Sequence, residues 1–351
     1  MPVGASHKRG RYTIALEALG GYLVSDTNRE PLFMSFSGMP FDDVRSLLSQ
    51  LETPDDTLAE AMTQAFARAG YPGTALGRLQ ELGIWLARTR RAVPPLIGKS
   101  GVALYAATHG FAEDALSEQR ARVDAVAAGA AAVSHLCVAG DLSLNVFDLA
   151  LDLPSKDIRG DASLDERSCA ATIAFGMEAT AEGVDLLCVG ALGAQAAIAA
   201  SAILLALLNG EPEQVGAADR NIVSEAISFH ADHLSDPLEV LRRLGGRDIA
   251  ALTGSILAAR AQNIPVVLDG LPALAAAAVL YRLAPHAISH CVLASSNSPL
   301  EIWAAEQLSL KPLLELEFSG EAGCAGAVAA GLVKSAAALA AGVAEVARRM
   351  G

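Results

Sequence analysis

From residue 100 onward, short and almost uninterrupted apolar runs alternate with longer Ala-rich stretches, and this alternation limits the folds open to the chain. A strand with one face in water alternates apolar and polar residues, whereas a strand covered on both faces is apolar throughout. Several of the runs have the second pattern, and the stretches between them can supply crossover helices. We therefore predict an α/β fold with a doubly wound parallel sheet. The predicted strands are VALYAA (102–107), LNVFDLAL (144–151), DLLCVG (185–190), IPVVLD (264–269), AISHCVLA (287–294) and LLELEF (313–318).

The two ends of the chain lack such runs and have helical patterns instead. FDDVRSLLSQL (41–51) and LGRLQELGIWLARTR (76–90) are helix-like, and residues 323–350 indicate one long C-terminal helix. Because these segments offer no strand to the sheet, we expect them to form a smaller helical domain or an arm that reaches a partner subunit. The predicted division is an N-terminal extension (1–44), a small helical domain (45–100 with the C-terminal helix 330–351) and a large parallel-sheet domain (101–329).

The amino-acid composition of the chain limits the kinds of molecule that it can bind. The 351 residues, 52% of them hydrophobic, suffice for a large core. A formal charge of -13, without a strong basic patch, argues against a nucleic-acid partner. The long uncharged window from Leu186 to Leu208 is interrupted by glycines and has no Trp or Tyr at its ends, so we predict no membrane contact.

The cysteines indicate the compartment. Five cysteines lie far apart without a CxxC pair, a pattern typical of scattered core thiols rather than of a disulfide framework or a zinc site. The N-terminus shows no long apolar segment followed by a cleavage site. We therefore predict a cytoplasmic protein with no bound metal ion.

Polar residues at the ends of the predicted strands are the candidates for chemistry, because ligands of open parallel sheets bind beyond the carboxyl ends of the strands. Glu321 lies among small and apolar residues, where burial would raise its pKa and suit it to act as a general base. A carboxylate stabilised by a helix N-terminus explains the same position. Asp269 and His109 are candidate substrate-binding residues, and each also fits a purely structural role, in a turn or as a satisfied histidine.

Several segments resemble a known family. DPLEVLRRLGGRDIAALTGSILAARAQNIPVVLDG (236–270) and LKPLLELEFSGEAGCAGA (310–327) resemble nicotinate-nucleotide:dimethylbenzimidazole phosphoribosyltransferases, which activate the lower ligand of cobalamin. YPGTALGRLQELGIWLA (71–87) is similar to the family's Pro-Gly-Ser-Leu-Gly-Arg-Leu-Glu segment, and ALYAATHGFAEDALS (103–117) to its Ala-Asp-His-Gly-Val stretch. The resemblance covers residues 45 to 345.

The resemblance implies a homodimer that transfers phosphoribose from nicotinate mononucleotide to dimethylbenzimidazole or a related base, with no metal or redox cofactor. Glu321 falls on the family's Gly-Glu-Gly motif, whose glutamate takes the imidazole proton as the nitrogen attacks the anomeric carbon. By the same resemblance, Ser117 would border the base pocket. Gly190, Gly193 and Gly320 would line the nucleotide site.

The chain departs from the family pattern at several positions, so a second hypothesis stays open. The family's Gly-Glu-Met-Gly-Ile-Gly-Asn-Thr-Thr loop is replaced by GALGAQAAI (190–198), which loses polar groups near the phosphoribosyl moiety. Ala322 replaces the second glycine of Gly-Glu-Gly, and Thr108 replaces the Asp of Asp-His-Gly. The alternative is a degenerate, non-catalytic paralogue that binds a ligand or completes a hetero-oligomer with a complete homologue.

Overall fold

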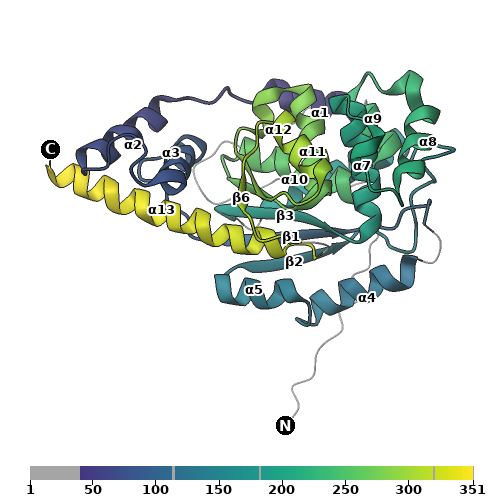
Figure 1. The fold of residues 1–351 in the computed structure, drawn as a ribbon, viewed down its shortest axis with the longest axis horizontal. Helices are drawn as coiled ribbons and strands as arrows, with labels where there is room; N and C mark the ends of the chain where they lie inside the picture. The colour runs from purple at the N-terminus through teal and green to yellow at the C-terminus, as the bar shows by residue number, and fades with distance from the viewer. Residues whose placement is uncertain (1–39, 113–114, 182, 319–320, 351) are drawn as a thin grey trace, which may run out of the picture. The chain divides into compact units, whose positions relative to one another are not determined.

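The computed structural model describes residues 40–112, 115–181, 183–318 and 321–350. Their centre is a six-stranded sheet in the order β2-β1-β3-β4-β5-β6, in which every neighbouring pair is parallel (Figure 1). This confirms the predicted doubly wound parallel sheet. The strands are β1 (Ser100–Ala106), β2 (Ser143–Asp148), β3 (Leu186–Leu192), β4 (Val266–Leu268), β5 (Cys291–Ser295) and β6 (Pro312–Leu314).

Helices cover both faces of the sheet. Figure 1 shows α7, α10 and α11 on one face and α4 and α5 on the other, with α13 crossing that second face. The helices are α1 (Pro40–Ser49), α2 (Thr57–Arg68), α3 (Gly77–Arg90), α4 (Ala115–Ala127), α5 (Ala132–Gly140), α6 (Glu166–Gly176), α7 (Ala194–Leu208), α8 (Arg220–His230), α9 (Pro237–Leu244), α10 (Arg247–Ala261), α11 (Gly270–Leu283), α12 (Pro299–Gln307) and α13 (Cys324–Met350).

The central strands are buried along their whole length, which explains their uninterrupted apolar sequence. All seven residues of β1 and all seven of β3 are buried. Successive residues point to opposite faces: Ala103 and Tyr105 join the core under α7 and α10, whereas Val102 and Leu104 join the core under α13. Two separate apolar layers therefore hold the sheet between them.

The chain reverses its direction of travel across the sheet next to β1. It runs from β1 outward to β2, and then returns past β1 to β3 and on to β6. Such a reversal leaves a crevice at the carboxyl ends of the two strands that flank it, here β1 and β3. The loops that follow these strands, at Ala107 and Gly193, therefore begin on either side of one crevice.

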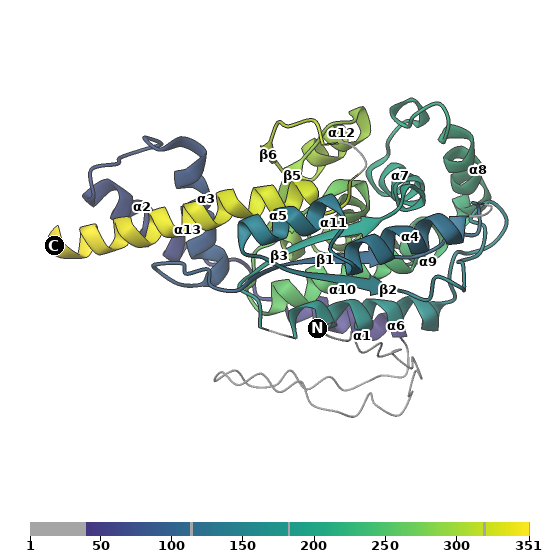
Figure 2. The same ribbon diagram turned by 90° about the horizontal axis from the view of Figure 1, so that it is seen from below.

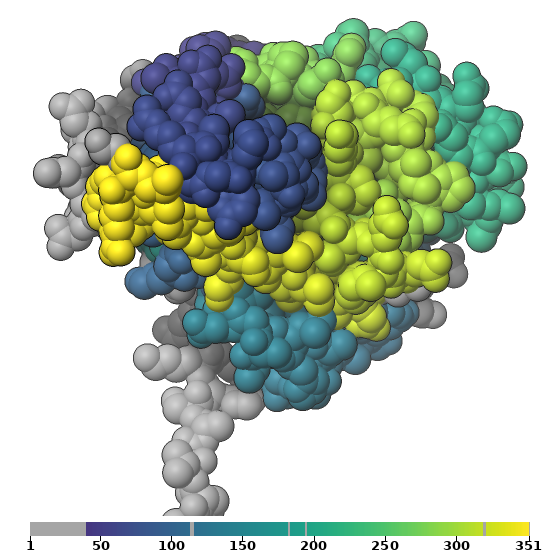
Figure 3. Space-filling view, turned by 60° about the vertical axis from the view of Figure 1, so that its left-hand side comes forward, coloured from purple at the N-terminus to yellow at the C-terminus, as the bar shows by residue number. Residues whose placement is uncertain are grey.

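Two helices from the N-terminal part pack on the far end of α13. Met62 and Phe66 of α2, Ala87 of α3, and Ala340 and Val343 of α13 form a hydrophobic cluster of their own. Figure 2 shows α13 running from the sheet past α5 towards these helices, and Figure 3 shows its end beside them on the surface. The predicted division into domains stays a prediction.

One helix crossing depends on glycine. A Cβ atom on Gly176 of α6 would lie 1.9 Å from the carbonyl oxygen of Ala251, and one on Gly254 of α10 would lie 1.8 Å from that of Ile173. Both helices also bury apolar residues in the larger core. The backbones of α6 and α10 therefore touch, and neither position has room for a side chain.

The predicted strands all overlap observed strands, and the main differences are at 313–318, where β6 ends already at Leu314, and at 287–294. There, Pro285–Ile288 forms a short 3-10 helix and β5 begins only at Cys291. A proline fixes its own φ and lacks an N–H donor, so it fits the first turn of such a helix. The apolar residues Ala287 and Ile288 are buried by this turn instead of by the sheet.

Two helical stretches of the described residues are long and apolar enough to cross a membrane by length and composition. Leu116–Gly140 comprises two helices, α4 and α5, with a left-handed turn at Gly129 between them. Cys324–Met350 is α13, which contributes to the core under the sheet and to the cluster with α2 and α3. The window from Leu186 to Leu208 forms β3 and α7.

Candidate functional site

Asp269 connects the end of β4 to the start of α13. Its carboxylate oxygen Oδ2 accepts a hydrogen bond of 2.7 Å from the backbone N–H of Gly326, in the first turn of the helix. Burial raises the pKa of Asp269 to about 6, and the charge of Glu301 adds to this effect, while backbone N–H groups of Gly323 and Gly326 oppose it. The site therefore contains a carboxyl group that keeps its proton to a higher pH than an ordinary aspartate does.

Glu321 lies just before α13, and its side chain is exposed. No hydrogen bond or ion pair holds its carboxylate among the described residues. Burial raises the pKa of the nearby Cys324 thiol to about 11, and the charges of Asp269 and Glu321 contribute to that shift. Two carboxyl groups thus gather around the first turn of α13, one anchored in the protein and one free to meet a ligand.

The loop after β5 joins this region from the other side. The side-chain amide of Asn297 donates a 2.5 Å hydrogen bond to the carbonyl oxygen of Phe318, in the segment that leads to Glu321. The carboxylate of Glu301 accepts hydrogen bonds of 2.9 Å from the backbone N–H groups of Asn297 and Ser298 and so fixes the loop. Loops from β4, β5 and β6 therefore meet at one end of the sheet.

The loop after β3 is held by a residue that the sequence analysis missed. Gly193 has a φ of 100°, and a Cβ atom there would lie 2.3 Å from the side-chain oxygen of Gln119. Gln119 is buried on α4 and donates a 2.5 Å hydrogen bond to the carbonyl oxygen of Leu192. A sequence signal existed, because Gln119 shares the apolar stripe of α4 with Val123 and Val126.

This end of the sheet also contains an unsatisfied polar atom. The side-chain oxygen of Gln195, in the first turn of α7, is buried without a hydrogen-bond partner among the described residues. Backbone N–H groups at the start of a helix are free to bind anions, and Gly193 is the residue that precedes α7. The turn therefore offers donors and an acceptor to a polar ligand.

His109 is buried and bonded within the protein. Its Nε2 atom lies 3.0 Å from Oδ2 of Asp248, and both side chains have at most 1% exposure. A Cβ atom on Gly246 would lie 2.4 Å from the imidazole, so this glycine allows the ring to approach α10. The Nδ1 atom of His109 has no partner among the described residues. The pair ties the loop after β1 to the start of α10.

The other candidate residues lie as follows. Gly190 is buried within β3, next to Leu104 and Asp269, and Ser117 is exposed near the start of α4, two residues before Gln119. Gly320 lies outside the described residues. Among the described residues, no group of three or more His, Cys, Asp or Glu side chains is placed to hold a metal ion. The structure thus brings Gly190 and Asp269 to the start of α13, the helix that Glu321 precedes.

Comparison with known proteins relates this arrangement to one family. A family model described as phosphoribosyltransferase matches residues 51–349. The nicotinate-nucleotide–dimethylbenzimidazole phosphoribosyltransferase of Sinorhizobium medicae is 46% identical over 333 residues, which cover 90% of this chain and 98% of that protein. The Agrobacterium fabrum enzyme of the same name is 45% identical over 328 residues, covering 89% and 95% of the two chains.

A solved structure agrees with the sequence matches. The crystal structure of the enzyme of that name from Thermus thermophilus superimposes with a TM-score of 0.69 at 27% identity, and covers 82% of this chain and 96% of that one. The chain therefore belongs to the nicotinate-nucleotide–dimethylbenzimidazole phosphoribosyltransferase family.

Proposed function

We propose that the chain transfers the phosphoribosyl group of nicotinate mononucleotide to dimethylbenzimidazole or a related base, as the names of its relatives describe. An imidazole nitrogen forms a bond to the anomeric carbon of the ribose, and the bond from that carbon to the nicotinate nitrogen breaks. The other imidazole nitrogen loses its proton to a general base, and nicotinate leaves. The product is the riboside phosphate of the base.

Glu321 is the proposed general base, and the observation that carries the proposal is its place beside the anchored carboxyl group of Asp269. Its carboxylate is exposed at the carboxyl end of the sheet, where loops from β4, β5 and β6 meet. An exposed, uncommitted carboxylate can accept a proton from a bound ligand, whereas one paired to a cation could not do so without breaking the pair. Asp269 would orient the ribose or the base through its second oxygen.

The nucleotide would lie over the turn between β3 and α7. Gly193 allows the side chain of Gln119 to pack against this turn, and Gly190 allows Asp269 to pack against β3, so both glycines would shape the nucleotide site. The N–H groups at the start of α7 would bind the phosphate, with Gly320 as a further nucleotide contact. Ser117 would border the base. His109 would contribute to substrate binding indirectly, because its bond with Asp248 holds the loop after β1 in place.

In a second hypothesis, the site binds a ligand but does not catalyse the transfer. The turn from Gly190 to Ile198 keeps one polar side chain, Gln195, where the family loop has Glu, Asn and two Thr, so phosphate binding there would depend mainly on backbone donors. This observation favours a non-catalytic paralogue that binds a ligand or completes a hetero-oligomer with a complete homologue.

We further propose that the protein is a cytoplasmic homodimer whose partners are small molecules, with no nucleic acid and no membrane. The five cysteines are free and buried, as in proteins of reducing compartments. Val138 of α5 and Met350 of α13 are 84% and 69% exposed, and a subunit contact would remove such apolar side chains from water.

The experiment is a chromatographic assay of the purified chain with nicotinate mononucleotide and dimethylbenzimidazole. Glu321→Gln should lower kcat by about 100-fold or more, the usual effect of losing a general base. Glu315→Gln, an exposed glutamate after β6, is the matched control and should keep full activity. Product formation that survives Glu321→Gln would refute the role of Glu321. Ligand binding without product in the unaltered chain would favour the second hypothesis.

A further inference from the structure

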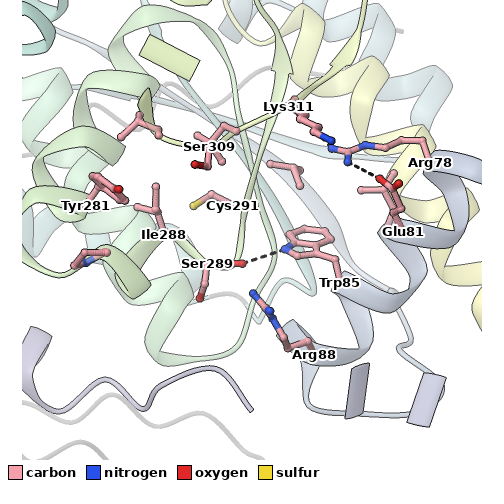
Figure 4. A pocket seen from close by; sticks show the side chains of 15 residues that line it. Arg78, Glu81, Trp85, Arg88, Tyr281, Ile288, Ser289, Cys291, Ser309 and Lys311 are labelled. Carbon is pink, nitrogen blue, oxygen red and sulfur yellow. Dashed lines mark hydrogen bonds and ion pairs between the residues drawn. The ribbon is translucent and has the colours of Figure 1, made fainter. Parts of the chain in front are cut away.

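A cavity of about 510 Å³ lies between α3 and the edge of the sheet formed by β5 and β6 (Figure 4). A volume of this size is typical of sites for small ligands. Its lining comes from three parts of the chain: α3, the end of α11 with the turn before β5, and the turn before β6. The lining residues used below are Arg78, Trp85, Arg88, Tyr281, Ile288 and Lys311.

The cavity is distinct from the candidate active site. It opens at the amino ends of β5 and β6, next to Cys291 and Lys311, whereas the proposed chemistry takes place beyond the carboxyl ends of the same strands. β5 has five residues, which span about 16 Å at the usual rise per residue. A ligand in this cavity would therefore not touch Glu321 or Asp269.

The charge of the cavity differs in sign from that of the whole chain. Arg78, Arg88 and Lys311 line it together with one acidic residue, Glu81, although the chain carries a formal charge of -13. Arg78 forms an ion pair of 2.9 Å with Glu81, and Arg88 forms one of 2.9 Å with Asp56.

One of the three cations is uncommitted. The ammonium group of Lys311 has no hydrogen bond or ion pair among the described residues. The Nη2 atom of Arg78 lies 3.4 Å from the carbonyl oxygen of Lys311, which brings the two cationic side chains to the same end of the cavity. An anionic group placed there would gain charge-assisted hydrogen bonds from the ammonium group of Lys311 and from the Nη2 atom of Arg78, while the Nη1 atom of Arg78 stays bonded to Glu81.

The remaining walls are mainly apolar and aromatic, with Ser289 and Ser309 as their polar residues. Trp85 donates a hydrogen bond of 3.1 Å from its indole N–H to the carbonyl oxygen of Ser289, which fixes the ring in place. Figure 4 shows Tyr281 on the opposite side of the cavity, with Cys291 and Ile288 between the two rings. Ile288 and Cys291 are buried. A flat, apolar ring would bury area against these groups while its charged end reached Lys311.

We propose that this cavity binds a small aromatic carboxylate, with the ring between Trp85 and Tyr281 and the carboxylate on Lys311 and Arg78. No covalent step is involved. The ligand would join α3 to the strand edge of the sheet, because its two halves contact different parts of the chain. The proposal does not depend on the proposed function, since it concerns other residues and a different edge of the sheet.

Isothermal titration calorimetry of the full chain with sodium benzoate tests this proposal. Saturable binding is expected, with acetate and benzamide at least tenfold weaker, because each lacks one half of the ligand. Lys311→Met keeps the aliphatic stem and should weaken benzoate binding by about tenfold, the effect of losing a hydrogen bond to a charged group. Lys99→Met removes an exposed charge outside the cavity and should leave the affinity unchanged.

Three results would overturn the proposal. The first is the absence of saturable binding of benzoate by the unaltered chain. The second is equal binding of acetate, which would show that the aromatic walls contribute nothing. The third is unchanged benzoate affinity in Lys311→Met, which would place the ligand elsewhere, the active site included. Because Lys311 is exposed, the variant should fold, and its circular dichroism spectrum would verify this.

Discussion

Asp269→Asn should make the protein more stable at neutral pH. The carboxyl group of Asp269 is buried at the start of α13, and its raised pKa of about 6 means that the charged form is disfavoured in the folded protein. Asn keeps an oxygen that can accept the hydrogen bond from Gly326 and has no charge to desolvate. The substitution therefore removes an unfavourable burial without opening a cavity.

The magnitude follows from the pKa. A rise from 3.8 to about 6 corresponds to about 3 kcal/mol at about 1.4 kcal/mol per pKa unit. Because the folded state binds the proton more tightly than the unfolded state, the stability that Asp269 contributes is fully present below the unfolded pKa of 3.8 and is lost as the pH rises through 6. The advantage of Asp269→Asn should therefore grow with pH, from about 0.5 kcal/mol at about pH 4 to as much as about 3 kcal/mol at about pH 7.5.

Urea titrations followed by circular dichroism at about pH 4.5 and about pH 7.5 measure this advantage. The difference in unfolding free energy between variant and wild type should increase by about 2 kcal/mol between the two pH values. Asp165→Asn is the control, because Asp165 caps α6 and its hydrogen bonds with Ser168 lower its pKa. Because a lowered pKa means that the charged form is favoured in the folded protein, the effect of this change has the opposite sign, a loss of stability that appears above the lowered pKa. It should stay within about 0.5 kcal/mol, because Asp165 is exposed and Asn caps helices about as well.

Two results would refute this reasoning. One is a loss of more than about 1 kcal/mol at about pH 7.5, which would mean that the charge on Asp269 stabilises α13 more than burial disfavours it. The other is an advantage that does not change with pH. A gain in stability together with a loss of turnover would show that the charge is retained for activity rather than for the fold.

Three other predictions concern helix packing, the KM for the nucleotide and the reactivity of the thiols. Gly254→Ala should lower the free energy of unfolding by more than about 2 kcal/mol, because the new Cβ atom would overlap the backbone of α6. Gly342→Ala, in open space on α13, should raise it by about 0.5–1 kcal/mol. Urea titrations compare the two variants. Gln119→Ala should raise the KM for the nucleotide, because it frees the turn at Gly193, and a KM equal to that of wild type would contradict this role. The five cysteines should react with Ellman's reagent only after unfolding, because they are buried and their thiol pKa values are raised; a fast-reacting thiol at about pH 8 would contradict the burial.

The sequence was sufficient to predict the sheet, because the central strands β1, β3, β4 and β5 are buried along their whole length and their residues are almost all apolar. The family and the enzyme class predicted from the motifs around residues 236–327 are also confirmed. The division into domains and the roles of the site residues remain predictions.

Long-range partners could not be predicted, because no local pattern encodes them. The bond from Gly326 to Asp269 spans 57 residues, that from Gln119 to Leu192 spans 73, and that between His109 and Asp248 spans 139. Each depends on where two crossovers bring the chain back to the sheet. A buried polar side chain in an apolar stripe, such as Gln119, indicates that a partner exists without indicating which one.

The length of α13 connects the proposed general base to a part of the protein that lies far from the site. Its 27 residues form a rod of about 40 Å, with the proposed base before one end and the cluster with α2 and α3 at the other. The near half of this rod packs under the sheet and Gly326 bonds Asp269, so a displacement at the far end reaches the proposed base through the packing of the whole helix. Because a misplacement of about 1 Å can cost a reaction about 100-fold, repacking around Ala340 would alter turnover without changing any group that meets the substrate.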